Sequence, residues 1–371
     1  MERIKILMVL ISTGMGGAEN FALNVVRNID RKKFQVDFAV TTYKESDIIY
    51  QECKKCGCNF FVLPRFLIYN YFWYVKSWRT FLSKHPYDIV YGHTTGSASI
   101  YLGVAKECGI KTIAHCHSAG FRGNWLHQFA KWIFTRNINN VSDYKFACSD
   151  KAAKHLYGKD FKKNSYYYNI PNAIDVNKYI FNTEIRKRIR SKYTIDERTF
   201  VCGHIGSFSP VKNHKFLLEI FQEVLKHRPN SKLLCCGGGV LLSDIRAKAS
   251  QMGIAEKVIF AGIVSNPHEY MMAMDCFIFP SFFEGFPISA LEAQATGLPL
   301  VMNDVISKEV DLAPIILRTD LSQPASYWAE LVLSVHSENR EHYNEIIANT
   351  KYNIKKSVQE FEQLYVALVK E

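Results

Sequence analysis

The chain has 371 residues, of which 48% are hydrophobic and 22% are charged, a composition typical of a globular protein with a sizeable core. This composition excludes a disordered chain, a collagen-like repeat and a peptide-sized scaffold. Lys and Arg total 46 against 35 Asp and Glu, which gives a formal charge of +11.

The positive charge is concentrated in the first half of the chain. Residues 1–180 hold 25 Lys and Arg against 13 Asp and Glu, a net of +12, whereas residues 181–371 hold 21 against 22, a net of −1. This asymmetry predicts two domains, one of which faces an anionic partner such as nucleic acid, a phospholipid surface or a phosphorylated substrate. No apolar run reaches the roughly 18 residues of a membrane span, so we expect a cytoplasmic protein.

Short runs of Val, Ile, Phe and Leu alternate with amphipathic segments, which predicts parallel sheets covered by helices. In the first half we expect a helix over 17–28 and strands at 4–11, 35–40, 59–63, 88–91, 111–115 and 144–148. The pattern restarts at 199–205, with further strands at 231–236, 257–261, 275–279 and 298–302. Both halves therefore read as doubly wound, Rossmann-like α/β domains.

The strand-helix rhythm is interrupted between Asn172 and Thr199, where Tyr166–Tyr168 and the charged stretch Glu184–Lys192 flank the join. We predict an N-terminal domain over 1–176 and a C-terminal domain over 177–354. A final helix over 355–371 carries an apolar stripe and could pack back on the N-terminal domain.

The first predicted strand opens onto a glycine loop. Gly16 and Gly17 precede the first helix, and glycines at a helix N-terminus let backbone N–H groups approach a phosphate or a sugar. The spacing is not that of a dinucleotide site, and a plain tight turn is the alternative.

The most informative segment is Phe277–Glu292, in which a strand runs into a short loop and then a helix. We expect this helix to open around Pro287 and to close at Gly297. Glu284 is then expected at the helix mouth and Glu292 about two turns further in. Two carboxylates so arranged could hold separate hydroxyl-bearing parts of one ligand.

Histidines end two strands of the first half. His115 and His117 lie two residues apart and share one face of a predicted strand. Such a pair can bind a metal, but no third ligand is evident in the sequence, and a buried structural histidine is the alternative reading. His93, after the preceding strand, is a further candidate.

Taken together, these motifs resemble the retaining GT-B glycosyltransferases of family 4, including bacterial enzymes of capsule and exopolysaccharide assembly. Glu284 and Glu292 match the family's paired-glutamate motif, and Gly16 and Gly17 match its first glycine loop. The segments that match elsewhere are 170–175, before the interdomain linker, and 206–214, after the first strand of the second domain.

The resemblance implies a role for each matched residue. Glu284 would contact hydroxyls of the donor sugar, Glu292 the ribose, Lys212 the diphosphate, and His117 the sugar carbon under attack, with His115 packing behind it. Further donor contacts are implied at Gly238, Ile263, Gly285, Phe286 and Ile288. Where the family usually has an arginine this chain has Ser207, so a second cationic clamp is missing. The resemblance implies no metal and no cofactor.

Two segments of the first half combine aromatic and basic residues, Pro64–Lys84 and Arg122–Arg136. Such faces suit an anionic membrane interface, and the alternative is a pair of helices buried against the sheet with lysines in solvent. No nucleic-acid motif is present.

We therefore expect a retaining transferase on the inner face of the plasma membrane. It would move a sugar, carried by UDP in the favoured reading, to a hydroxyl of a lipid-linked saccharide. The alternatives are a nucleotide-sugar epimerase or hydrolase on the same scaffold, and a non-catalytic binding protein for sugar nucleotides or polysaccharides. Closure of the two domains would expel water from the donor.

Overall fold

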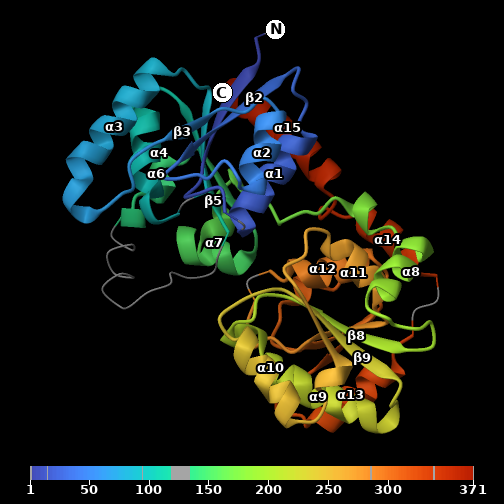
Figure 1. The fold of residues 1–371 in the computed structure, drawn as a ribbon. Helices are drawn as coiled ribbons and strands as arrows, with labels where there is room; N and C mark the ends of the chain where they lie inside the picture. The colour runs from blue at the N-terminus through green and yellow to red at the C-terminus, as the bar shows by residue number, and fades with distance from the viewer. Residues whose placement is uncertain are drawn as a thin grey trace. The chain divides into compact units, whose positions relative to one another are not determined.

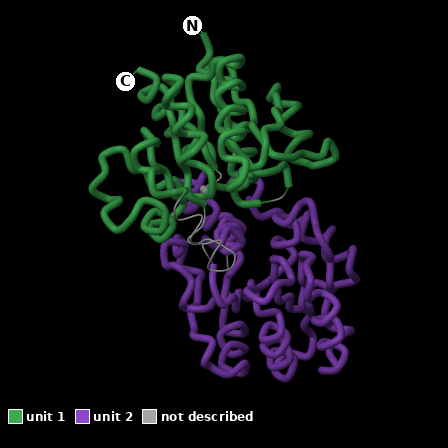
Figure 2. Tube along the Cα trace, turned by 90° about the vertical axis from the view of Figure 1, so that its left-hand side faces the viewer, with its two compact units in different colours: residues 1–174, 354–371 green, residues 175–353 purple. Residues whose placement is uncertain are grey.

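The computed structural model describes residues 2–14, 16–93, 95–117, 134–284, 286–336 and 339–370. The chain forms two compact units, shown in different colours in Figure 2. Unit 1 comprises Met1–Ile174 and Ile354–Glu371, and unit 2 comprises Asp175–Asn353. The chain therefore passes into unit 2 two residues before the expected boundary, and the C-terminal helix belongs to unit 1.

Unit 1 is built on a parallel sheet with the strand order β3-β2-β1-β4-β5-β6-β7. Its strands are β1 (Ile4–Val9), β2 (Phe34–Val40), β3 (Phe60–Val62), β4 (Ile89–Gly92), β5 (Lys111–Cys116), β6 (Tyr144–Ala147) and β7 (Tyr167–Asn169). Its helices in the described residues are α1 (Gly17–Asn28), α2 (Ile48–Lys55), α3 (Tyr71–Lys84), α4 (Ala98–Glu107), α6 (Ile138–Val141), α7 (Asp150–Tyr157) and α15 (Ile354–Lys370).

Each face of this sheet has its own core. Helices α1, α2 and α15 cover one face, and α3, α4, α6 and α7 cover the other (Figure 1). Helix α15 joins unit 1 because Ile354, Val358, Phe361, Tyr365 and Leu368 are all buried in the first of these cores. Burial of this apolar stripe explains why the end of the chain returns to the domain in which it began.

Unit 2 repeats the design with the strand order β10-β9-β8-β11-β12-β13. Its strands are β8 (Phe200–Ile205), β9 (Ser231–Cys236), β10 (Val258–Gly262), β11 (Cys276–Phe279), β12 (Leu300–Asn303) and β13 (Ile316–Thr319). Its helices are α8 (Thr183–Lys192), α9 (His214–His227), α10 (Leu242–Gln251), α11 (Pro267–Ala273), α12 (Ile288–Ala295), α13 (Ala325–Ser334) and α14 (Arg340–Ala348).

The structure differs from the sequence-based expectation at the sheet edges. Tyr167–Asn169, within the stretch read as an interruption, forms the edge strand β7 paired with β6, and β13 pairs with β12 at an edge that the sequence did not indicate. Both strands are short and carry polar residues, so neither stands out as an apolar run, whereas the edge strands β3 and β10 do. Helix α1 has the expected bounds.

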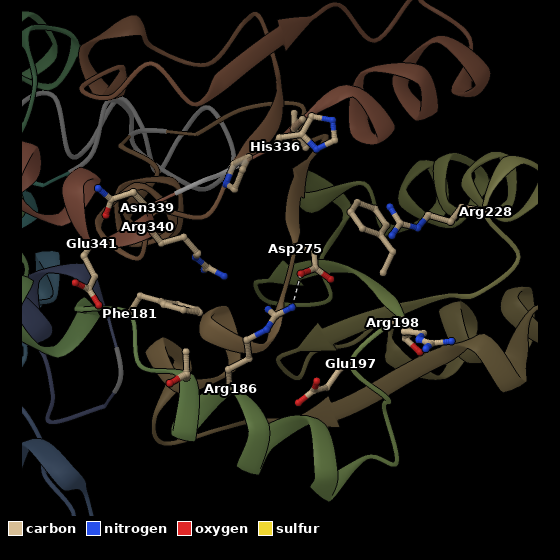
Figure 3. Close-up of a pocket in the computed structure, with 15 residues that line it drawn as sticks. Phe181, Arg186, Glu197, Arg198, Arg228, Asp275, His336, Asn339, Arg340 and Glu341 are labelled. Atoms are coloured by element: carbon tan, nitrogen blue, oxygen red, sulfur yellow. Dashed lines mark hydrogen bonds and ion pairs between the residues drawn. The ribbon is translucent and has the colours of Figure 1, made fainter.

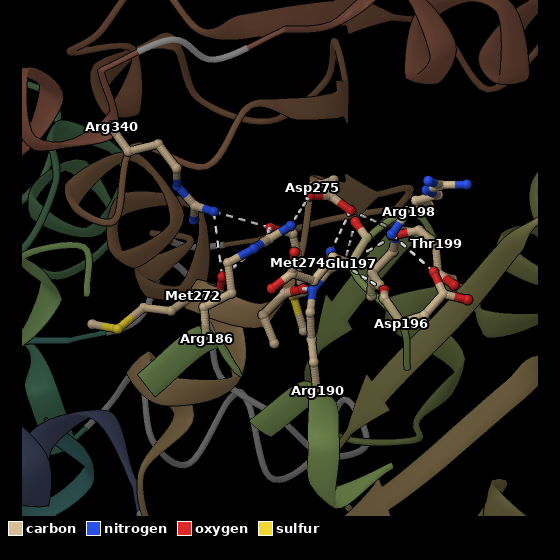
Figure 4. Close-up of polar contacts among 12 residues, drawn as sticks. Arg186, Arg190, Asp196, Glu197, Arg198, Thr199, Met272, Met274, Asp275 and Arg340 are labelled. Atoms are coloured by element: carbon tan, nitrogen blue, oxygen red, sulfur yellow. Dashed lines mark hydrogen bonds and ion pairs between the residues drawn. The ribbon is translucent and has the colours of Figure 1, made fainter. Parts of the chain in front are cut away.

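At the amino edge of the unit 2 sheet, Asp275 holds several elements together (Figure 4). Its carboxylate forms ion pairs with Arg186 and Arg190 of α8 at 2.5 and 2.6 Å, and it accepts the Val201 N–H at 2.8 Å. Arg340 of α14 donates to the carbonyl oxygens at the end of α11, such as that of Met274 at 3.0 Å. These arginines cap buried carbonyls and so fix α8 and α14 to the sheet.

Among the described residues, no helix combines the length and the apolar character needed to cross a membrane.

Candidate active site

The candidate donor site of unit 2 lies at the carboxyl edge of its sheet. Because β8, β9, β10 and β11 are neighbours and run parallel, the loops that follow them meet at one edge. Hydrogen bonds tie these loops together: the Phe208 N–H donates to the Gly238 carbonyl at 2.9 Å, and the Phe282 N–H donates to the Val211 carbonyl at 2.9 Å. The fold therefore assembles four loops that are far apart in sequence.

Lys212 and Glu284 meet in this group of loops. The Lys212 Nζ lies 2.7 Å from Oε1 of Glu284, and the two side chains are only 16% and 15% exposed. The same ammonium lies 5.0 Å from the centroid of the Phe279 ring. The pair brings a cation and a carboxylate together in a partly dry site, which suits a ligand with both phosphate and hydroxyl groups.

The loop after β9 approaches its neighbour so closely that only glycine fits. A Cβ on Gly237 would lie 2.0 Å from the Gly206 carbonyl oxygen, and one on Gly239 would lie 2.6 Å from that of Phe208. Gly238 packs against Ile263, whose side chain is 87% exposed just after β10. A ligand at this edge can therefore approach the backbone without meeting a side chain from the loop.

Helix α12 begins at Ile288, with Pro287 as its N-cap, one residue later than expected. Glu292 consequently lies about one turn inside the helix, and the expectation of two turns is wrong because residues 284, 286 and 287 are not helical. The Ile288 N–H already donates to the Phe286 carbonyl at 3.0 Å. The helix ends where expected, since Gly297 adopts a φ of +64°.

Glu292 is held by a hydrogen bond from another segment of unit 2. The Tyr179 hydroxyl donates to Oε1 of Glu292 at 2.5 Å. Burial raises the pKa of Glu292 to about 7, and the bond from Tyr179 opposes that rise. Sequence reasoning gave no sign of this partner, because 113 residues separate the two side chains.

Three further predicted contacts have different outcomes. Ser207 is exposed, and its Oγ lies 3.2 Å from that of Ser209, so it adds no cation to the loop. Phe286 stacks on Tyr352 with ring centroids 5.1 Å apart. Gly285 lies outside the described residues.

The candidate site of unit 1 also lies at a carboxyl edge. Strands β1, β4 and β5 are neighbours, so the Gly16 loop, His93 and His117 follow adjacent strands. Gly16 is the extended N-cap of α1, and a Cβ on Gly17 would lie 4.0 Å from Nδ2 of Asn172. The first glycine loop and the segment before the interdomain linker thus come together at this edge.

The three histidines form one buried group. Nδ1 of His93 and Nε2 of His117 lie 2.8 Å apart, and the rings of His115 and His117 have centroids 3.9 Å apart. Nδ1 of His115 lies 2.8 Å from the Tyr91 hydroxyl. The expectation that the His115 and His117 pair lacks a third metal ligand is therefore wrong: His93 supplies a third ring, and each residue offers a nitrogen within 4.8 Å of the others.

Burial keeps these rings neutral. Desolvation lowers the pKa of His117 to about 4, and the Asn172 side chain opposes that shift. Desolvation also lowers the pKa of His93 and of His115 well below the usual value, with the neighbouring rings adding to the effect. Neutral imidazoles can accept a proton, donate one or bind a metal.

Two cavities lie elsewhere in unit 2. One of about 630 Å³ adjoins the end of β10 and is lined in part by Ile263, Lys192 and Tyr270. The other, of about 690 Å³, lies at the amino edge beside Arg186, Asp275 and Arg340 (Figure 3). The second cavity lies at the opposite edge of the sheet from the strand-end loops, and two of its arginines, Arg186 and Arg340, already donate to carbonyls and Asp275.

In the aromatic and basic segment Pro64–Lys84, some aromatic side chains are buried against the sheet and others are exposed, so each of the two alternatives holds for part of it. Tyr74 and Trp78 of α3 are buried in the core, whereas Phe72 and Trp73 are 86% and 59% exposed. The exposed set also includes Leu67, Ile68, Tyr69 and Tyr71. Most of the second segment, Arg122–Arg136, lies outside the described residues.

Comparison with known proteins agrees with this arrangement. Residues 15–178 match the family model described as Glycosyltransferase Family 4, and residues 185–311 match that described as Glycosyl transferases group 1. The chain is 28% identical over 363 residues to the putative glycosyltransferase EpsF of Bacillus subtilis (strain 168), covering 95% of this chain and 94% of the relative.

The chain is also similar to a second relative and to a solved structure. An Escherichia coli UDP-Gal:alpha-D-GlcNAc-diphosphoundecaprenol alpha-1,3-galactosyltransferase is 26% identical over 314 residues, covering 78% of this chain and 77% of that enzyme. Anabaena HepE in complex with UDP-glucose superposes with a TM-score of 0.77 at 16% identity, covering 98% of this chain and 100% of that one. The chain therefore belongs to the glycosyltransferases of the GT-B fold, with a family 4 segment in unit 1 and a group 1 segment in unit 2.

Proposed function

We propose that the protein is a retaining glycosyltransferase that moves a sugar from a UDP-sugar to a hydroxyl of a lipid-linked saccharide in surface polysaccharide assembly. The observation that carries the proposal is the ion pair of Lys212 with Glu284 among the four strand-end loops of unit 2. The names of two similar proteins support the donor and the acceptor: the Escherichia coli relative is a UDP-Gal transferase acting on a diphosphoundecaprenol saccharide, and HepE is bound to UDP-glucose.

Lys212 and Glu284 form an ion pair in the free protein, so the donor competes with this pair. A diphosphate carries more negative charge than one carboxylate, and it draws the Lys212 ammonium toward its oxygens. Glu284 is then free to accept hydrogen bonds from hydroxyls of the donor sugar. In the transition state Lys212 stabilises the charge that develops on the departing diphosphate, and we propose that transfer proceeds without a catalytic metal.

The rest of the nucleotide has partners in unit 2. Glu292 accepts hydrogen bonds from the ribose hydroxyls, and the glycine loop at Gly238 lets the diphosphate approach the backbone. The base lies against Ile263 and the backbone after β10. The cavity of about 630 Å³ beside Ile263 supports this orientation.

The transfer step joins the acceptor oxygen to the anomeric carbon on the face that the diphosphate leaves. The bond to the diphosphate breaks with its electron pair, and the acceptor proton passes to a leaving phosphate oxygen. His117, kept neutral by burial, polarises the reacting sugar through its ring or its backbone. Retention follows because entry and departure share one face.

We further propose that unit 1 docks on an anionic membrane that carries the acceptor. Unit 1 holds 27 Lys and Arg against 15 Asp and Glu, a net of +12, whereas unit 2 holds 19 against 20. The exposed aromatics Phe72 and Trp73 suit the headgroup region, and Lys76 and Arg79 of the same helix are also exposed.

Incubation with a panel of UDP- and GDP-sugars tests the donor. A nucleotide that binds only the folded state stabilises it by about 2.7 kcal/mol at a concentration one hundred times its dissociation constant, so the melting temperature rises. The accepted donor is then mixed with an undecaprenyl diphosphate saccharide, and NMR of the product shows whether the anomeric configuration is retained.

Two outcomes contradict the proposal. Consumption of the UDP-sugar at the same rate without acceptor indicates an epimerase or a hydrolase. A shift in melting temperature with no turnover in any mixture indicates a binding protein that regulates rather than catalyses.

A further inference from the structure

The histidine group of unit 1 offers three imidazole nitrogens as possible metal ligands, and the binding of a sugar nucleotide does not require them. His93, His115 and His117 come from the ends of two neighbouring strands, β4 and β5, whose register pairs Gly92 with Ala114. His115 is fully buried, His93 is 6% exposed, and His117 is half-buried, so a ligand can reach the group from the side of His117. Phe21 packs on all three rings, with centroid distances between 4.9 and 5.6 Å.

Each ring keeps a nitrogen without a partner. Nε2 of His93 is buried and has no hydrogen-bond partner; Nε2 of His115 and Nδ1 of His117 are also buried without a hydrogen bond of ordinary geometry, although the Ile170 backbone and the Asn172 side chain raise the pKa of these two rings. Burying a polar nitrogen without a partner is unfavourable, because the nitrogen loses its hydrogen bond to water. Three such rings side by side are unusual in a buried core, because buried polar side chains normally have hydrogen-bond partners.

We propose that His93, His115 and His117 bind a divalent transition-metal ion of the zinc class, and that the ion withdraws His117 from sugar transfer. The second half of this statement rests on the function proposed above, whereas the first half is independent of it.

The spacing of the rings fits such an ion. Zinc binds imidazole nitrogen at about 2.0–2.1 Å in tetrahedral geometry, which separates its ligand atoms by about 3.3 Å. Nδ1 of His93 and Nε2 of His117, now 2.8 Å apart, need to part by only about 0.5 Å to admit the ion in place of their shared proton.

The proton balance is simple. Each neutral ring carries one proton, and the proton between His93 and His117 moves by exchange to the ring nitrogen that has no partner. No net proton is released. Nδ1 of His115 lies 2.8 Å from the Tyr91 hydroxyl, so that in the ion-bound state this hydroxyl would accept the Nδ1 proton and Nε2 of the ring would keep the lone pair that the ion requires.

The same donor set selects against the hard cations of the cell. Mg²⁺ and Ca²⁺ require oxygen ligands, and the group that the structure describes consists of three imidazoles. Three histidine ligands leave a fourth coordination position for water, so the ion exchanges with chelators. We therefore expect reversible inhibition of transfer by Zn²⁺ and none by Mg²⁺.

Direct titration with Zn²⁺ tests the site on the full chain. The exposed thiol of Cys108 is first removed as Cys108→Ser, because surface thiolates also bind zinc. Isothermal titration of this background is expected to show one equivalent of Zn²⁺ bound. His93→Asn and His115→Asn are each expected to weaken binding at least tenfold, whereas His155→Asn, which changes an exposed histidine of the same unit, leaves it unchanged.

Independent readouts keep the proposal falsifiable. Zn²⁺ should raise the melting temperature of the background protein but not that of folded His93→Asn, and Co²⁺ should give the visible spectrum of a tetrahedral nitrogen site. Equal zinc affinity of the background and of both histidine variants overturns the site.

Measurements of transfer activity separate zinc binding from its proposed effect on His117. Loss of transfer on adding Zn²⁺, with recovery on adding a chelator, supports the withdrawal of His117. Zinc binding with undiminished transfer overturns that half. If no donor is ever turned over, the proposed function fails while the titration still decides the metal site.

Discussion

Lys212 and Glu284 illustrate how a site can be kept ready without a ligand. The two side chains are mostly buried and 2.7 Å apart, so each compensates the charge of the other, and under the proposed function a donor would take over that role. In an exposed pair the two charges would stabilise each other less, because water already solvates both groups.

Replacement of Glu284 by Ala is expected to lower the rate of transfer by at least about a hundredfold, because the donor sugar loses its hydroxyl acceptor and Lys212 loses its orientation. Transfer of radiolabelled sugar measures the loss, and circular dichroism checks the fold. The matched control is Glu223→Ala, which breaks an ion pair with Lys226 of the same 2.7 Å length, outside the site. Near-normal transfer by Glu284→Ala contradicts the assignment.

Glu292 predicts a pH dependence of donor binding. Its raised pKa of about 7 means that the carboxyl is mostly protonated at pH 6 and mostly ionised at pH 8, and the ribose hydroxyls bind the ionised form better. Affinity for the UDP-sugar should therefore fall by up to about tenfold from pH 8 to pH 6. The phosphates of a UDP-sugar do not titrate in this range.

Isothermal titration with Glu292→Gln supplies the control, since an amide has no proton to lose. His204 and His214 of the same unit stay neutral throughout, because burial holds the pKa of His214 at about 4 and that of His204 well below its usual value. Burial also lowers the pKa of His268, whose ring lies 5.7 Å from that of Tyr179. A pH dependence that persists in Glu292→Gln would assign the effect to another group.

At the scale of elements, helix α15 is the clearest case of a segment whose place is decided by its buried face. Phe361 is 1% exposed and packs against Phe21 of α1 with ring centroids 5.6 Å apart. Because Phe21 also contacts the three histidines, the C-terminal helix supports the floor of the unit 1 site.

Phe361→Ala is expected to destabilise unit 1 by about 3–5 kcal/mol, the usual cost of emptying a buried aromatic site. Urea denaturation followed by tryptophan fluorescence measures the change, and Gln363→Ala, an exposed position of the same helix, serves as the comparison. Equal stability of the two variants would show that α15 is not part of the unit 1 core.

For the whole molecule, the charge asymmetry between units predicts how the protein meets a membrane. If unit 1 docks as proposed, its net charge of +12 would attract anionic lipid over about a Debye length, and the exposed aromatics of the α3 region would add an apolar contact. Neither contribution involves the nucleotide, because the candidate donor residues belong to the near-neutral unit 2.

We expect the protein to float with anionic vesicles and not with zwitterionic ones, and to detach at high salt. The double replacement Phe72→Ser and Trp73→Ser should reduce flotation severalfold, whereas Tyr166→Ser, at another exposed aromatic of unit 1, should not. If the wild-type protein sediments and floats with neither kind of vesicle, the membrane proposal is refuted.

Much of the fold was predictable because parallel sheets bury both faces of their strands, and buried strands stand out as apolar runs. The interior strands and helix α1 follow from these runs, as does the restart near residue 200. The edge strands β3 and β10 also follow from such runs, whereas β7 and β13 do not, because both are short and their polar residues interrupt the apolar pattern.

By itself, the sequence determined the fold class, the repetition of two parallel-sheet units and the residue types at the strand ends, because periodicity and local propensity encode these properties. Only the tertiary structure decided which of those residues meet. It paired Lys212 with Glu284, Tyr179 with Glu292, and His93 with His117. These contacts depend on strand order and loop geometry, which arise from packing over long sequence separations and leave no local pattern in the chain.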